Sequence, residues 1–211
     1  MDEPGPDLRS LAALARAENA CRRCPLFRDA TQVVPGEGRP RARMLLVGEQ
    51  PGDREDLEGR PFVGPAGRIL DEALREAEIP REETFVTNAV KHFKHARRGK
   101  RRLHKKPNAY EIDRCRWWLD IERALLKPAV VVALGATAAR GVAGRPLVVG
   151  RARGSAMSLP DGSRLVVTVH PSYLLRIRNS GDWRSEYRRF VADLRVAARC
   201  VPAEPGHVSA A

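Results

Sequence analysis

Four short apolar runs, each followed at once by a polar or glycine-rich stretch, constrain the fold of this chain most strongly. The runs cover residues 42–47, 84–87, 130–134 and 165–169. Helical patterns lie between and after them, at residues 66–78, 110–126, 136–142 and 183–199. Strands that alternate with helices are typical of a parallel sheet whose two faces are covered by helices. The sequence therefore predicts an α/β fold with a central sheet of four parallel strands.

The chain has 211 residues, which suits one domain with a sizeable core. We expect this domain to cover residues 1–200, with an inserted basic loop at residues 91–107. Residues 201–211 are expected to form a disordered tail.

The charge of the chain is concentrated in that loop. Its sequence, KHFKHARRGKRRLHKKP, carries nine of the 38 lysines and arginines and no acid, so the net charge of +12 falls to +3 outside it. A local basic patch indicates an anionic partner, with nucleic acid the first expectation and an acidic membrane the second. The plain alternative is a solvated, disordered basic arm.

The sequence predicts an intracellular protein. No apolar run has the length of a membrane span, and the N-terminus, MDEPGPDL, lacks the apolar core of a signal peptide. We expect a monomer located in the cytoplasm and associated with the nucleoid. Structural disulfides are not expected among its four cysteines.

Cys21 and Cys24 form a C-x-x-C pair, which suits a metal ion or a redox dithiol. The pair follows a helical pattern and precedes Pro25, whereas a thioredoxin-like pair would follow a strand and begin a helix. A metal site is therefore favoured.

Three polar residues at the ends of different strands predict a common site. Glu49, Asn88 and His170 each follow an apolar run, and ligands of parallel sheets bind beyond the carboxyl ends of the strands. We expect the three side chains to meet in one crevice.

Five motifs in the same order resemble the uracil-DNA glycosylase superfamily: GEQPGDREDLEGRPFVGPAG, TNAVKHFK, KRRLHKKP, LGATA and HPSYLLR. The similarity is greatest to the iron–sulfur family-four group and, within it, to the UdgX branch. The resemblance covers about residues 21–194. It implies a three-layer α/β/α fold, a 4Fe–4S cluster, uracil-containing DNA as partner and excision of uracil from it.

The resemblance also implies how the base is recognised. His170 would donate a hydrogen bond to uracil O2, and the amide of Asn88 would pair with N3–H and O4, a pattern that cytosine does not offer. Phe62 would stack on the extruded base, although a buried phenylalanine is more often a core residue. Gly48 would lie against the uracil.

His104 is the residue that sets the UdgX branch apart, because its loop histidine resembles a nucleophile that captures C1′ of the sugar. Here Lys100, Arg101, Arg102, Leu103 and His104 match the pattern of that loop. Glu49 and Gln50 would orient the imidazole and support its charge. The adduct would persist, since an N-alkylimidazole is a poor leaving group.

Several residues are expected to contact the DNA backbone: Lys100, Arg101, Arg102, Ser172 and Arg176. For Arg102 the alternative is to hold the loop against the acidic GEQPGDRED segment. Asp53 and Asp56 of that segment would orient the site or cap the next turn, and Asp56 is favoured as the helper. Leu174 or Leu175 would either wedge into the base stack or pack in a core.

The family-four resemblance implies four cysteine ligands for the cluster, and this chain departs from that pattern. Cys21, Cys24 and Cys115 match three of them, whereas His92 stands at the remaining position. We predict a Cys₃His cluster. His95 in place of His92, a set of only three protein ligands, and zinc as the metal stay open.

Three hypotheses follow from the sequence. The first is a single-turnover glycosylase that ends covalently bound to abasic DNA through His104. The second is a conventional turnover glycosylase. The third is a non-enzymatic iron–sulfur protein that binds DNA.

Overall fold

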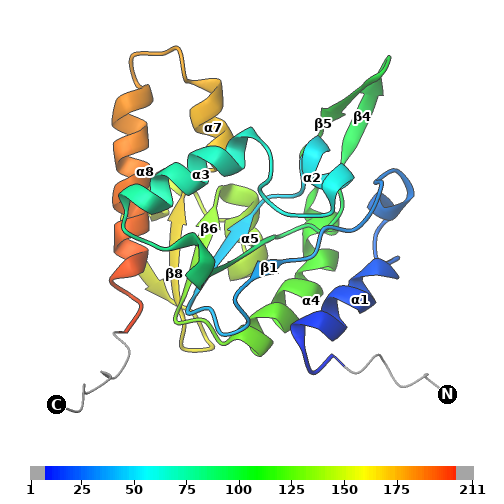
Figure 1. Cartoon of the computed structure of the whole chain (residues 1–211), viewed down its shortest axis with the longest axis horizontal. Coiled ribbons are helices and arrows are strands. Elements are labelled where there is room, and N and C mark those ends of the chain that lie inside the picture. Colours follow the sequence, from blue (N-terminus) through cyan, green and yellow to red (C-terminus); the bar gives the residue numbers. More distant parts are fainter. Residues whose placement is uncertain (1–7, 203–211) are drawn as a thin grey trace.

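The computed structural model describes residues 8–202, and its centre is a six-stranded sheet with the order β1-β3-β2-β6-β8-β7 (Figure 1). The four inner strands run parallel. They are β2 (Met44–Gly48), β3 (Thr84–Asn88), β6 (Val130–Leu134) and β8 (Arg164–Thr168). The predicted α/β fold is confirmed, and each inner strand lies at a predicted apolar run.

The predicted count of four strands is wrong, because two short antiparallel strands complete the sheet. β1 (Glu37–Gly38) pairs with β3, and β7 (Ala156–Ser158) pairs with β8. Strands of two and three residues leave no periodic pattern in a sequence.

Helices cover both faces of the sheet, since successive strand residues point to opposite sides. Leu46 faces a core formed with α3, α7 and α8, and its neighbour Leu45 faces a second core formed with α4 and α5. The bounds are α3 (Pro65–Glu76), α7 (Pro171–Arg176), α8 (Trp183–Ala198), α4 (Ala109–Leu126) and α5 (Ala136–Ala143).

The remaining helices are short or peripheral. α1 (Leu11–Asn19) packs on α4 through a third apolar cluster. The others are α2 (Asp53–Glu58), α6 (Val149–Ala152) and the 3₁₀ turns η1 (Pro25–Arg28) and η2 (Arg81–Glu83). None of the helices within residues 8–202 has the length and apolar character that a membrane crossing requires.

Most of the predicted basic loop is a β-hairpin that projects from the body of the molecule (Figure 1). Its strands are β4 (His95–Arg98) and β5 (Arg101–His104). Gly99 begins the two-residue turn between them with φ at 58°, a value that favours glycine. This glycine between two arginine pairs is the signal that identifies the turn in the sequence. The expectation of a disordered tail falls, from residue 203 onward, outside the described residues.

Candidate active site and metal centre

The residues that were predicted to converge line one cavity of about 850 Å³ at the carboxyl ends of the inner strands. Glu49 follows β2, Asn88 ends β3 and His170 follows β8. Phe62 and His104 line the same cavity. The cavity thus combines an amide, a carboxylate, two imidazoles and an aromatic ring.

Gly48 creates the space in which Asn88 and Phe62 approach each other. It pairs with Asn88 in the sheet register. A Cβ atom at position 48 would lie 2.3 Å from Asn88 Oδ1 and 2.6 Å from Phe62 Cζ. Both side chains are buried, yet the amide of Asn88 has no hydrogen-bond partner among residues 8–202. The amide is therefore available to a ligand in the cavity.

His170 is held as a neutral ring with one defined tautomer. It is the N-cap of α7, and its Nδ1 accepts a hydrogen bond from the backbone N–H of Ser172 at 3.1 Å. Because Nδ1 is the acceptor, the ring proton resides on Nε2. Burial lowers the pKa of His170 to about 4, and the neighbouring His104 and Arg176 act in the same direction. The ring also stacks near Phe62, with 5.9 Å between centroids.

Glu49 connects the sheet to the hairpin. Thr137, in the LGATA segment after β6, donates its hydroxyl to Glu49 Oε2 at 2.5 Å. The other carboxylate oxygen lies 3.4 Å from His104 Nε2. Thr137 was not among the residues predicted for the site, although it lies within the LGATA motif.

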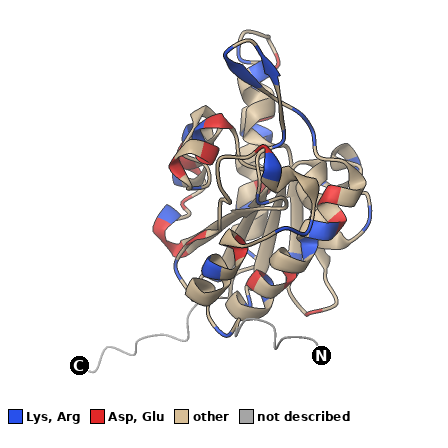
Figure 2. Ribbon diagram, turned by 90° about the vertical axis from the view of Figure 1, so that its right-hand side faces the viewer, with Lys and Arg blue, Asp and Glu red and all other residues tan. Residues whose placement is uncertain are grey.

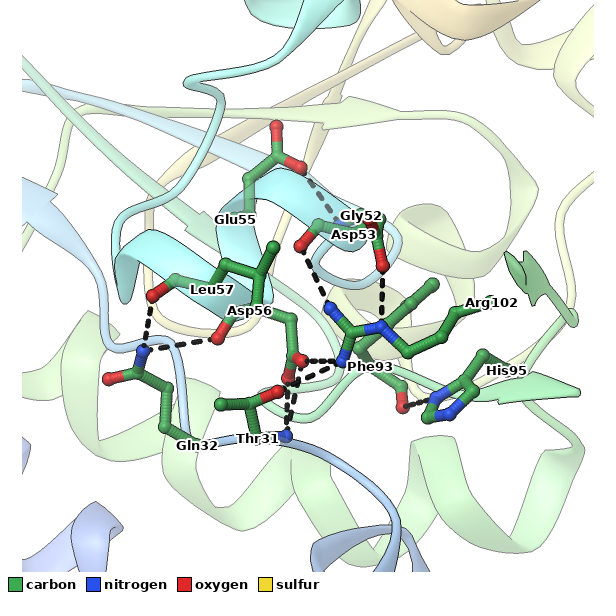
Figure 3. Close-up of polar contacts among 10 residues, drawn as sticks. All are labelled: Thr31, Gln32, Gly52, Asp53, Glu55, Asp56, Leu57, Phe93, His95 and Arg102. Carbon is green, nitrogen blue, oxygen red and sulfur yellow. Dashed lines mark hydrogen bonds and ion pairs between the residues drawn. The ribbon is translucent and has the colours of Figure 1, made fainter. Parts of the chain in front are cut away.

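Arg102 fastens the hairpin to α2 and to the N-terminal segment (Figure 3). Its guanidinium donates to Asp53 Oδ1 at 2.6 Å, to Asp56 Oδ2 at 2.5 Å and to Thr31 Oγ1 at 2.9 Å. Asp56 is fully buried and also accepts from the backbone N–H of Thr31. Of the two roles expected for Arg102, the structure has the contact with the acidic segment, and Asp56 is the predicted helper.

The hairpin register turns His104 toward the same side as Arg102. Residues two apart in a strand share a face, so Arg102 and His104 face the body, whereas Arg101 and Leu103 face away. Leu103 is correspondingly 40% exposed. Fixing Arg102 on Asp53 and Asp56 therefore aims His104 at Glu49.

Gln50 closes the base of the hairpin. Its Nε2 donates to the carbonyls of Lys94 and Lys105, both at 3.1 Å, and its Oε1 accepts from the backbone N–H of Lys94. The side chain thus contacts the entry and the exit of the hairpin, which is a positioning role.

Six of the nine basic residues in the predicted loop are exposed, and the hairpin forms a projecting basic arm (Figure 2). They are Arg97, Arg98, Lys100, Arg101, Lys105 and Lys106. Lys94 instead pairs with Glu111 at 2.9 Å. The basic surface is therefore smaller than the sequence suggested.

The inclusion of Lys91 in a DNA-gripping loop is wrong, because this lysine is fully buried. Its Nζ lies 2.7 Å from Glu122 and 3.8 Å from Glu18, and it donates to Thr87. Burial raises the pKa of Glu18 to about 8, with the positive charge of Lys91 acting in the opposite direction. Glu122, at 2.7 Å, is therefore the main partner of a cation that the sequence placed at the surface.

The residues of the HPSYLLR motif divide between cavity and core. Ser172 and Arg176 line the cavity, as their predicted contact with DNA requires. Leu174 is fully buried in the core, which excludes it as a wedge in this arrangement, and Leu175 packs partly buried against the same core.

Cys21, Cys24 and Cys115 meet in the buried cluster between α1 and α4. Trp118 Nε1 donates to Cys21 Sγ at 3.1 Å, and the backbone N–H of Lys91 donates to Cys115 Sγ at 3.3 Å. Burial raises the pKa of Cys115 to about 12. N–H donors aimed at sulfur stabilise a thiolate, which is the form that binds iron. These three thiols fit a metal centre.

His92 is buried beside this region. Burial lowers its pKa to about 4, Asp56 acts in the opposite direction, and Arg22, inside the C-x-x-C segment, lowers it further. The ring is therefore neutral, as a ligand must be. His95 instead stacks on Phe93 at the base of the hairpin, 5.0 Å between centroids.

Among residues 8–202, no three His, Cys, Asp or Glu side chains converge closely enough to hold a single metal ion.

Comparisons with known proteins agree with this geometry. The family described as "Uracil DNA glycosylase superfamily" matches residues 35–195. A type-4 uracil-DNA glycosylase of Thermotoga maritima is 40% identical over 174 residues, which are 82% of this chain and 84% of the relative. Type-4 enzymes of Sulfurisphaera tokodaii and Archaeoglobus fulgidus are 39% and 35% identical over 60% and 63% of this chain, and 54% and 63% of their own lengths. The chain belongs to the uracil-DNA glycosylase superfamily.

Proposed function

We propose that this protein excises uracil from DNA and then bonds through His104 to C1′ of the abasic sugar, as in the UdgX branch. The observation that carries the proposal is the placement of His104 at the rim of the cavity, with Nε2 3.4 Å from Glu49 Oε1. The same cavity holds the residues suited to bind and activate uracil.

The cavity can recognise and polarise the base. The free amide of Asn88 offers a donor for O4 and an acceptor for N3–H, whereas cytosine presents the reverse pattern. Phe62 supplies a stacking surface beside His170. The Nε2–H of neutral His170 is free to donate to O2, where negative charge develops as the bond from C1′ to N1 breaks.

Capture follows from the charge left on the sugar. Uracil departs with the bonding electron pair, and C1′ acquires oxocarbenium character. A ring nitrogen of His104 donates its lone pair to C1′, and the second ring nitrogen then loses its proton to Glu49 or to water. Glu49, oriented by Thr137, supports the transient positive charge of the ring. The product is an N-alkylimidazole, which resists hydrolysis.

Incubation with a uracil-containing oligonucleotide, followed by a denaturing gel, tests the proposal. A band of reduced mobility that persists in SDS, limited to one equivalent of protein, is the expected result. Abasic product in excess of protein without that band would identify a turnover glycosylase. If neither product forms, the chain is a DNA-binding protein and the proposal fails.

Replacement of Arg102 by glutamine is expected to slow capture by about 10- to 100-fold, because a small displacement of a reacting group has such effects. Uracil release should change much less, since Arg102 does not line the cavity. Quenched time courses that score free and crosslinked products separately measure both rates.

Arg101→Gln is the matched control for this variant. It removes the same charge from the neighbouring residue, which faces away from the body. Equal loss of capture in the two variants would mean that capture depends on the positive charge of the hairpin and not on the contacts of Arg102 with Asp53 and Asp56. Arg102→Lys should behave as Arg102→Gln does, because an ammonium group cannot contact Asp53 and Asp56 through a planar fork.

We also propose that Cys21, Cys24, Cys115 and His92 hold a 4Fe–4S cluster. When bound, the cluster would crosslink the N-terminal segment to α4 and to the base of the hairpin. A brown protein with broad absorbance near the ultraviolet is expected, whereas a zinc protein is colourless.

Cys115→Ser should bleach this absorbance and lower the free energy of unfolding by about 4 kcal/mol, the scale on which loss of a structural metal acts. Cys200→Ser is the control, because Cys200 lies on the opposite side of the sheet, against the core of α3, α7 and α8. It should retain full colour and stability. Visible spectra and thermal unfolding of the two variants decide the matter.

A further inference from the structure

A second cavity, of about 480 Å³, lies beside the main one. It is formed by α3, by the end of α7 and the residues after it, and by the first turn of α8 (Figure 1). Its lining residues are Pro65, Arg68, Ile69, Glu72, Leu175, Arg178, Trp183 and Arg184. Pro65 and Leu175 belong to the glycosylase motifs, whereas the other six lining residues lie outside them, and the proposed chemistry does not use this cavity.

Three arginines give the second cavity a positive charge. Arg68, Arg178 and Arg184 come from three separate segments, and all three are exposed. None of them forms an ion pair within the described part of the chain, and Glu72 is the one acid in the lining. Unpaired cations around a hollow attract an anion.

Trp183 lines the same cavity and carries a donor without a partner. Its ring stacks on Tyr187, with 5.1 Å between centroids and 11° between planes, so its orientation is fixed. Its Nε1–H is buried and has no acceptor within residues 8–202. A buried donor without a partner is costly, and an oxygen of a bound anion would satisfy it.

The two cavities share their dividing wall. Ala66 of α3 and Arg176 of α7 line the main cavity, whereas Ile69 and Arg178 line the second. Ala66 and Ile69 are three residues apart in one helix, a rise of about 5 Å. Both cavities therefore border α3 and the end of α7.

We infer that the second cavity binds a backbone phosphate of the DNA strand next to the extruded nucleotide. This inference rests on the proposed function, because it assumes that the main cavity takes a nucleotide of that strand. Arg178 and Arg184 would neutralise the phosphate, and Trp183 would donate to one of its oxygens. The basic hairpin and this cavity would then hold the strand on two sides of the site.

Fluorescence anisotropy with labelled oligothymidylate tests the inference without any uracil chemistry. Arg178→Gln/Arg184→Gln should bind about 10-fold more weakly at low salt, and its slope of log affinity against log salt should be shallower by about 1.4, the value for two contacts to a single strand. Trp183→Phe keeps the ring, removes the donor and should weaken binding about threefold to tenfold.

The matched control is Arg41→Gln/Arg199→Gln, which removes two exposed arginines away from both cavities. Its salt slope should equal that of the unmodified protein. If the two double variants behave alike, only net charge matters and the inference is overturned.

A parallel assay of uracil release keeps the two proposals separate. One outcome is that the unmodified protein releases no uracil while Arg178→Gln/Arg184→Gln still loses oligothymidylate binding. That result would contradict the proposed function and support the phosphate site. Normal uracil release by the unmodified protein, together with unchanged oligothymidylate binding by the double variant, would support the proposed excision of uracil and contradict the phosphate site.

Discussion

Replacement of His104 by serine is expected to abolish the SDS-resistant complex with uracil-containing DNA and to leave uracil release largely intact. The hydroxyl of serine has neither the nucleophilicity nor the reach of the imidazole, so water attacks C1′ instead. His104 lies at the rim, with 49% of its side chain exposed, and the groups suited to bind uracil lie deeper. Denaturing gels and a separate assay of free uracil measure the two products.

His95→Ser is the matched control, because His95 pairs directly with His104 across the hairpin. It removes an imidazole from the same face of the same hairpin, and crosslinking should persist. Undiminished crosslinking by His104→Ser would refute the capture mechanism. Loss of crosslinking in both variants would indicate that the hairpin, and not one nucleophile, had been disturbed.

The inner part of the fold was predictable from sequence because its strands are fully buried. Each of the four runs is mostly apolar, and the polar residues that follow them identify the edge where the site forms. The edge strands β1 and β7 were not predictable, since their pairing depends on neighbours distant in sequence. Local pattern identifies buried elements and misses short ones.

The sequence predicted which residues line the site, but it did not predict which charged residues around the site form ion pairs. Glu49, Asn88 and His170 converge as the strand ends implied. Composition alone made Lys91 part of a basic loop, whereas the structure buries it between Glu18 and Glu122, which lie far away in the sequence. For Arg102 the sequence left open a contact with DNA or with the acidic GEQPGDRED segment, and the structure has the contacts with Asp53 and Asp56. Charge runs in a sequence do not show which charges are paired.

His170→Ala is expected to lower the rate of uracil release by about 10²- to 10³-fold, the usual cost of removing a donor from a developing oxyanion. Crosslinking should fall in parallel, because capture requires prior loss of the base. Ser172→Ala is the control: it removes the hydroxyl near Nδ1 but keeps the backbone N–H that fixes the tautomer. A loss of less than about 10-fold is expected there. Equal rates for His170→Ala and the unmodified protein would remove His170 from the mechanism.

The neutral state of His170 has a second, independent signature in the stability of the protein. Because the pKa of His170 is about 4 in the folded protein and about 6.5 for an ordinary histidine, mainly the unfolded chain gains this proton as the pH falls from about 6.5 to 4. The free energy of unfolding therefore decreases on acidification, by about 2–3 kcal/mol from this residue. Denaturant unfolding of His170→Ala should show a smaller decrease over the same interval. Identical pH dependence in the two proteins would mean that His170 has the same pKa in the folded and the unfolded chain, and the conclusion that burial holds this ring neutral would then be wrong.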